Sequence, residues 1–319
     1  MTSLSPPRPF SKLSGPTLGI LLKLASTVVF TGMVVCVKLA SQRIPAGELV
    51  FARSLFGAVP LLLMVAWQGT LSTAFKTGRP GTHIARSAVG VTSMALWFLC
   101  LGMIPLPDAM AIGYAAPIFT VVMAALLLGE TVRIYRWSAV AVGFVGIIII
   151  LAPKLSLFEA GASFNTTAGS LAALGSAVTV SLAIVLIRKL AKTETTATMV
   201  LYFSVLASAF SLLSIPFGWV MPTVPEATLM IASGLFGGVG QLLMTESVRH
   251  ADASTIATFD YAGMIWGLLA GALIFGETLG LSTALGTLLL LASGIFIIWR
   301  ERRIGIRRRA EENDPTPDM

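Results

Sequence analysis

The chain has 319 residues, of which 55% are hydrophobic and only 12% are charged, and its mean hydropathy is +0.87. A soluble domain carries about 25% charged residues, so the composition excludes a soluble protein and indicates an integral membrane protein. The formal net charge of +7 does not by itself indicate nucleic-acid binding, because basic residues also set membrane topology.

Apolar stretches of about 20 residues recur along the chain, and each can cross a ~30 Å hydrocarbon core as a helix. Strands of a membrane barrel would instead alternate polar and apolar residues. The predicted spans lie near residues 17–40, 46–67, 83–102, 108–128, 137–152, 168–188, 198–219, 227–246, 253–275 and 281–299. The sequence therefore predicts an all-α integral membrane fold with ten transmembrane helices, five in each half.

The connections between these spans are short, and the longest, around 68–82 and 153–167, have only about 15 residues. They leave no room for a soluble domain. Function is therefore expected among the helices themselves.

Lys and Arg residues predict the orientation, because cationic loops resist translocation. With the N-terminus in the cytoplasm, only Arg43 and Lys154 fall on the outer side. Three more of the 22 lie inside spans, and the other 17, Arg86 among them, fall on the cytoplasmic side. Both termini are then cytoplasmic, and residues 301–319 form a basic and then acidic tail that either orients the last span or contacts anionic lipid headgroups.

One pattern occurs twice, as YAAPIFTVVMAALLLGE at Tyr114–Glu130 and as YAGMIWGLLAGALIFGE at Tyr261–Glu277, and both copies continue into Thr. The copies lie 147 residues apart, which predicts two five-helix repeats, residues 17–152 and 168–300. Because each repeat has an odd number of helices, the second crosses the membrane in the opposite sense to the first. The repeats are therefore expected to be inverted.

Each copy of the pattern ends in Gly-Glu at the end of a predicted helix. Gly at such a position closes a helix, and we expect the following Glu130 or Glu277 to bind backbone amides that open the next helix. This interpretation makes both residues structural.

Ten predicted helices in two inverted sets, each with an apolar helix that ends in Gly-Glu-Thr, resemble the EamA-type branch of the drug/metabolite transporter superfamily. The resemblance covers residues 17–300. It implies a secondary transporter (permease) of the bacterial inner membrane, with both termini cytoplasmic and a central cavity between the halves. It also implies that small organic metabolites cross by alternating access.

Three stretches, HIARSAVGVTSMALWF, IPLPDAMAIGYAAPIF and ADASTIATFDYAGMIWG, look most like a branch that includes S-adenosylmethionine and riboflavin uptake carriers. Members that look related also export amino acids. Where the S-adenosylmethionine carriers that it resembles have Arg between two aromatic residues, this chain reads Phe259-Asp260-Tyr261. Because an acid stands here in place of a base, the substrate of those carriers cannot be assigned directly to this chain.

Asp260 is the clearest candidate for a functional group inside a span. It follows Asp252 by eight residues, which places it about 12 Å along the predicted helix. A carboxyl at that depth raises the free energy of membrane insertion, so one that is present there is often functional. Asp260 is a candidate proton carrier or counter-charge for a cationic substrate group, and the alternative is a structural carboxyl bonded to a neighbouring helix.

Arg53 lies five residues past Glu48, roughly 7 Å deeper in its predicted helix. Such an arginine binds a substrate carboxylate or phosphate, pairs with an acid such as Glu48, or extends to the interface. Lys23 and Lys38 lie near the ends of the first predicted span, and we expect both to extend to the interface.

Aromatic side chains on the repeated helices offer flat surfaces for a planar or cationic ligand. Trp97, Tyr114, Tyr261 and Trp266 are the candidates for the cavity, although two symmetric tyrosines could also serve packing alone. In the eighth predicted span, Gln241 is the better polar candidate, because Glu246 lies close to the membrane interface.

The sequence offers little support for an enzyme, because it has no HExxH motif, P-loop or cysteine cluster. We expect no metal, cofactor or nucleic-acid partner, and protons remain a candidate coupling ion for a monomer or homodimer. Uptake of a vitamin or cofactor-like molecule is favoured over export of an amino acid, another metabolite or a drug, and over lipid flipping. A channel or membrane sensor is the alternative of another class.

Overall fold

The computed structural model describes residues 15–67, 69, 76–129, 132–155, 163–250 and 259–312. In the first half, its helices are α1 (Gly15–Ala40), α2 (Ala46–Trp67), α4 (Pro80–Met103), α5 (Leu106–Gly113), α6 (Ala116–Leu128) and α7 (Ile134–Leu151). In the second half, they are α8 (Phe164–Leu190), α9 (Thr196–Ser211), α10 (Val224–His250), α12 (Ala262–Phe275) and α13 (Leu281–Glu312). Short 3₁₀ segments are η1 (Ala152–Lys154), η2 (Leu212–Phe217) and η3 (Phe259–Tyr261).

The prediction of an all-α membrane fold is confirmed. Within the described residues, nine helical segments are long and apolar enough to cross a membrane, and Phe259–Phe275 forms a shorter apolar helix. The predicted span 253–275 is described only from residue 259 onward. Large apolar side chains such as Ile148, Leu273 and Leu288 are 62%, 81% and 64% exposed, which is the surface expected of a protein that faces lipid.

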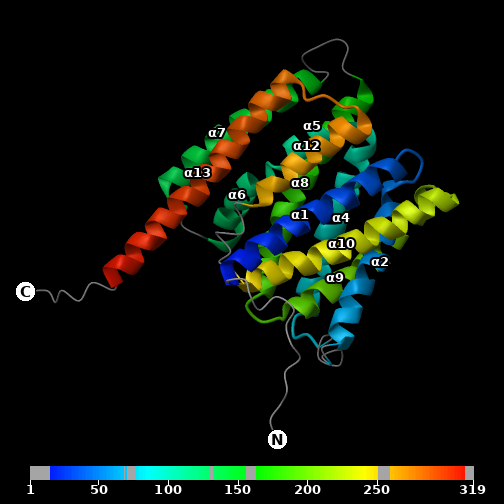
Figure 1. Ribbon diagram of the computed structural model, residues 1–319, viewed down its shortest axis with the longest axis horizontal. Coiled ribbons are helices and arrows are strands. Elements are labelled where there is room, and N and C mark those ends of the chain that lie inside the picture. The colour runs from blue at the N-terminus through cyan, green and yellow to red at the C-terminus, as the bar shows by residue number, and fades with distance from the viewer. Residues whose placement is uncertain are drawn as a thin grey trace, which may run out of the picture.

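Helix packing follows the repeat. The helix α1 packs against α10 and α12, while its counterpart α8 packs against α4 and α6. The helices α2 and α9 contact each other, as do α7 and α13. When the two halves are exchanged, the contacts of α1 become those of α8, and the α2–α9 and α7–α13 contacts become themselves. In Figure 1, α7 and α13 lie side by side along one edge, and α1 and α10 cross the body of the bundle.

Glycines permit the closest of these helix contacts. A side chain on Gly238 of α10 would lie 2.5 Å from the Gly57 carbonyl oxygen of α2, and one on Gly146 of α7 would lie 2.7 Å from the Gly286 carbonyl oxygen of α13. Both crossings therefore bring backbone against backbone, as is common in membrane helix pairs.

The short connections gather at the two ends of the bundle. Residues 41–45, 104–105 and 218–223 lie at one end, together with 276–280, and we call it the Arg43 end; hydrogen bonds join these segments. Residues 76–79 and 191–195 meet at the opposite end, which we call the Arg188 end. The described part of the basic tail continues α13 as helix to Glu312, beyond the predicted span.

Candidate functional site

The two copies of the repeated pattern are both interrupted at their tyrosine. In the first copy, α5 ends at Gly113 and α6 begins at Ala116, so Tyr114 lies between them. Pro117 explains this break, because proline lacks an amide hydrogen and its ring crowds the carbonyl four residues earlier. In the second copy, Tyr261 ends η3 immediately before α12, although Met264 stands in the place of Pro117.

Tyr114 and Tyr261 meet at the interface between the halves. Their ring centroids lie 5.8 Å apart and their planes are inclined by 30°. The Tyr114 hydroxyl donates a hydrogen bond of 2.9 Å to the Asp260 carbonyl oxygen. Gly263 leaves room for that hydroxyl, since a side chain there would lie 3.1 Å from it. Broken helices and free backbone carbonyls at such a point are typical of transporter binding sites.

Next to this pair of tyrosines lies a hollow of two lobes, which we call the aromatic cavity. One lobe has a volume of about 340 Å³ and extends to Ser93 and Ser176, and the other, of about 210 Å³, extends to Thr31 and Asp260. Both lobes are lined by Trp97, Met110 and Tyr114. The aromatic cavity is mostly apolar with a few polar groups, as binding sites for small molecules are.

Asp260 forms an ion pair with Lys23 of α1. The Asp260 side chain is 56% exposed and lines the smaller lobe, whereas the Lys23 side chain is only 4% exposed. The carboxylate therefore contacts a buried ammonium group on one side and the cavity on the other. This arrangement permits a substrate cation or a proton to compete with Lys23 for the carboxylate.

The prediction that Lys23 and Lys38 extend to the interface is wrong. Lys38 is 5% exposed, and its ammonium group lies 3.0 Å from a Glu277 oxygen and donates to the carbonyls of Leu101 and Ile104. Both lysines are neutralised by an acid from the other half, because an unpaired ammonium group within a membrane is expensive.

The Gly-Glu motif has a different partner from the one predicted. Gly276 closes α12 with a left-handed φ of 63°, as expected. The Glu277 carboxylate, however, accepts a hydrogen bond of 2.7 Å from the amide of Leu106, which opens α5 in the other half. The prediction that it binds the next helix is therefore wrong. Its counterpart Glu130 lies outside the described residues.

Arg53 and Gln241 lie apart from the aromatic cavity. Both line a smaller hollow of about 50 Å³ between α2, α4, α9 and α10, which we call the arginine cavity. Arg86 of α4 lines it too. Because α4 begins at Pro80, Arg86 lies almost two turns into the helix, and its assignment to the cytoplasmic side stays a prediction.

The remaining aromatic candidate, Trp266, is 37% exposed. It lies on the flank of α12, because the neighbouring positions Gly263 and Gly267 are those that line the aromatic cavity. The structure thus brings together Trp97, Tyr114, Tyr261 and Asp260, and separately Arg53 and Gln241, and does not bring Trp266 to either group.

Sequence reasoning missed Met110 and the role of Lys23. Met110 lines both lobes of the aromatic cavity, but a methionine in an apolar helix carries no sequence signal. Lys23 did carry one, because a lysine inside an apolar span requires a partner, and Asp260 is an acid inside a span of the other half.

A further cavity, of about 470 Å³, lies toward the Arg188 end, where Arg136, Arg188 and Thr120 line it. Val180 of α8 lines both this cavity and the larger lobe of the aromatic cavity. The two hollows therefore meet at one side chain.

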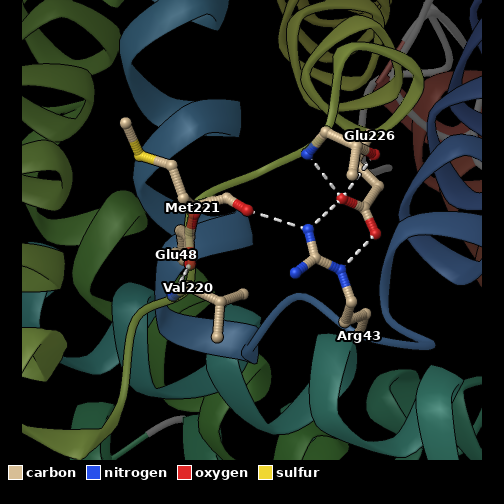
Figure 2. Close-up of polar contacts among 6 residues, drawn as sticks. Arg43, Glu48, Val220, Met221 and Glu226 are labelled. Carbon is tan, nitrogen blue, oxygen red and sulfur yellow. Dashed lines mark hydrogen bonds and ion pairs between the residues drawn. The ribbon is translucent and has the colours of Figure 1, made fainter.

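Polar contacts between the halves gather at the Arg43 end. Figure 2 shows the Arg43 guanidinium in an ion pair with Glu226, where its Nε donates a hydrogen bond of 2.7 Å, and also bonded to the carbonyl of Met221. The hydrogen bond that Arg43 donates to the Glu226 carboxylate raises the pKa of Arg43 above its usual value. The Glu48 carboxylate accepts from the amide of Val220 at 3.1 Å. These contacts join the first half to the second across this end.

Other contacts join the halves at the same end. Asp108 accepts a hydrogen bond of 2.6 Å from Thr283 of the second half, and within its own half it pairs with Lys154 at 2.6 Å. The bond to Thr283 and the contacts of Glu277 hold the start of α5 to the second half.

The model of the EamA-like transporter family matches residues 17–152 and 167–299. An S-adenosylmethionine uptake transporter of Rickettsia bellii is 26% identical over 90% of this chain and 95% of its own length. A pseudopaline exporter of Pseudomonas aeruginosa is 30% identical over 87% of this chain and 94% of its own. A riboflavin transporter of Vibrio cholerae is 28% identical over 79% of this chain and 83% of its own length.

A solved crystal structure superposes on this chain with a TM-score of 0.63 at 19% identity, over 90% of this chain and 99% of the other. That likeness concerns the fold alone. The family match spans both halves, and the named relatives are transporters rather than enzymes. The chain is therefore a multi-pass membrane protein that belongs to the EamA-like transporter family.

Proposed function

We propose that this protein is a secondary transporter that moves a small organic metabolite across the bacterial inner membrane by alternating access. The observation that carries the proposal is the aromatic cavity at the interface of the halves, where Tyr114 and Tyr261 stack at the two helix breaks. A site between two similar bundles can be exposed to either side when one bundle rocks against the other.

Among the described residues, more hydrogen bonds and ion pairs join the halves at the Arg43 end than at the Arg188 end, where Thr77 and Gly78 bond to Glu194, and this difference supports the mechanism. At the Arg43 end, contacts of Arg43, Glu48, Asp108 and Glu277 join the halves. Toward the Arg188 end, the 470 Å³ cavity meets the aromatic cavity at Val180. This arrangement is the one expected of a carrier closed at one end and accessible from the other.

The orientation is part of the proposal. The excess of Lys and Arg predicts that the Arg188 end and both termini face the cytoplasm, so the state described here is open toward the cytoplasm. The repeats, residues 17–152 and 168–300, would then be the two moving bodies, and the tail 301–319 would lie at the cytoplasmic surface.

For the substrate we favour a vitamin or cofactor-like molecule taken up by the cell. The flat faces of Trp97, Tyr114 and Tyr261 suit a planar molecule, and two of the named relatives are an S-adenosylmethionine uptake transporter and a riboflavin transporter. Export is the second candidate, because a relative at 30% identity is a pseudopaline exporter. In either direction, Asp260 is the group we assign to proton coupling or to binding a substrate cation.

Transport by the purified full chain in liposomes tests the proposal. We expect saturable uptake of one labelled compound from a panel of riboflavin, S-adenosylmethionine and amino acids. We also expect faster uptake when the same unlabelled compound is loaded inside, because a carrier returns faster when occupied. Uptake that does not saturate would indicate a channel and contradict the proposal, whereas transport of amino acids alone would reject only the preferred substrate class.

A further inference from the structure

Among the residues that the structure describes, two arginines inside the bundle form no ion pair with an acid. Lys23 pairs with Asp260, and Lys38 pairs with Glu277. In the described part of the chain, no such ion pair is formed by Arg53 or Arg86, although both lie within membrane-spanning helices. The chain thus neutralises its buried lysines and leaves these two guanidinium groups uncompensated.

Both arginines line the arginine cavity, and neither donates a hydrogen bond to a described side chain. The guanidinium carbon of Arg86 lies 3.7 Å from the centroid of the Phe203 ring, while its Nε and Nη1 are buried without a hydrogen-bond partner among the described residues. Cation–π contact with an aromatic face orients a guanidinium group but leaves its hydrogen-bond donors unused.

Two glycines make room for these groups. A side chain on Gly237 of α10 would lie 3.1 Å from the Nε of Arg53, and one on Gly90 of α4 would lie 2.7 Å from the Phe203 ring and 3.4 Å from Arg86. Arg53 therefore lies against the backbone of α10, and Phe203 is held against Arg86. The positions of both guanidinium groups are set by packing, so they are available before any ligand arrives.

The geometry points to a binding site for one anionic group. Two like charges that face one cavity repel each other, and an anion between them would remove the repulsion. Guanidinium groups present donors in a planar fork that matches carboxylate and phosphate oxygens. Ser204 and Gln241 line the same cavity and add polar side chains. A volume of about 50 Å³ holds a few water-sized groups, enough for a carboxylate or phosphate but not for a whole metabolite.

We propose that Arg53 and Arg86 bind the carboxylate or phosphate group of the transported molecule between the two halves, at a site distinct from the aromatic cavity. The inference rests on the proposed transport function for the identity of the ligand. Because α2 and α4 belong to the first half and α9 and α10 to the second, an anion here would contact both moving bodies.

Thermal unfolding of the detergent-purified full chain tests this site with sodium phosphate and sodium succinate as probes, against sodium chloride at equal ionic strength. We expect phosphate or succinate to stabilise the wild type saturably. Arg53→Met and Arg86→Met should each weaken that binding about tenfold to a hundredfold, as loss of a charged hydrogen-bond partner does. Arg53→Lys should retain part of it, and the control Arg133→Gln, which removes an exposed charge elsewhere, should retain all of it.

The same variants separate a binding role from a structural one. Arg53 and Arg86 have no acidic partner to lose, so the ligand-free Met variants should unfold at the wild-type temperature or above it. A marked decrease would show that the arginines hold the fold and would overturn the proposal. No stabilisation by either anion, or equal stabilisation of wild type and Met variants, would overturn it too.

Binding and transport can fail separately. Anion binding that depends on both arginines, in a protein that transports none of the panel, would keep the site and reject the transport function. Saturable transport without anion binding would support the transport function and reject the anion site. To exclude a bound lipid headgroup as the source of the anionic group, phosphate binding is measured before and after exhaustive delipidation. Binding that appears only after delipidation would identify a lipid as the native occupant and contradict the substrate assignment.

Discussion

Asp260→Asn is expected to abolish accumulation of substrate driven by a pH gradient and to destabilise the folded protein by about 3 kcal/mol. Loss of one partner of a buried ion pair costs about 3–5 kcal/mol, and we expect the lower end because the Asp260 side chain is 56% exposed. The cost arises at Lys23, whose 4% exposed side chain would keep its charge with no carboxylate beside it. Thermal unfolding and uptake in liposomes with an imposed pH gradient measure the two effects.

The double variant Lys23→Met and Asp260→Asn is the matched control for the stability effect. It removes both charges, so no ammonium group is left buried without a carboxylate beside it. The double variant should therefore regain most of the stability but not the proton-driven accumulation. If Asp260→Asn still accumulates substrate up a pH-driven gradient, Asp260 is not the coupling group. If the single and double variants unfold alike, the Lys23 pair does not stabilise the fold.

Glu277→Ala is expected to cost about 3–5 kcal/mol, because it leaves the charge of Lys38 unpaired. It also removes the acceptor for the Leu106 amide at the start of α5. Lys38 is 5% exposed and would retain the carbonyls of Leu101 and Ile104 and the face of the Phe275 ring, none of which carries a negative charge. A large decrease in the unfolding temperature is therefore expected.

Glu226→Gln provides the contrast at the same end of the bundle. Its partner Arg43 has a side chain that is 46% exposed, and exposed ion pairs are worth about 0–1 kcal/mol. We expect this variant to unfold close to the wild-type temperature. Equal losses for Glu277→Ala and Glu226→Gln would contradict the assignment of Glu277 as a buried link between the halves.

The fold was largely predictable from the sequence because its signals are local. Apolar runs of membrane length and the copied pattern at Tyr114 and Tyr261 can be read without knowing how the helices pack. The break at Tyr114 could be anticipated from Pro117. The second copy has Met264 at the position of Pro117, and a methionine does not predict that the helix is interrupted at Tyr261.

The partners of the buried charges were not predictable in this way. Lys23 and Asp260 lie in different halves, as do Lys38 and Glu277, so their pairing depends on how the two repeats pack. Arg86 lies inside the predicted span 83–102, but its place in a hollow lined by α2, α9 and α10 also depends on how the two repeats pack.

If the two halves rock about the aromatic cavity, closure of the Arg43 end must be relieved during each transport cycle. The direct test introduces Arg43→Cys and Glu226→Cys and joins them with a short, reducible bifunctional thiol reagent in the reconstituted protein. The native Cys36 and Cys100 are buried, and each single-cysteine variant treated in the same way is the control. We expect transport to stop on cross-linking and to return after reduction, and an unchanged rate in fully cross-linked protein would contradict the claim.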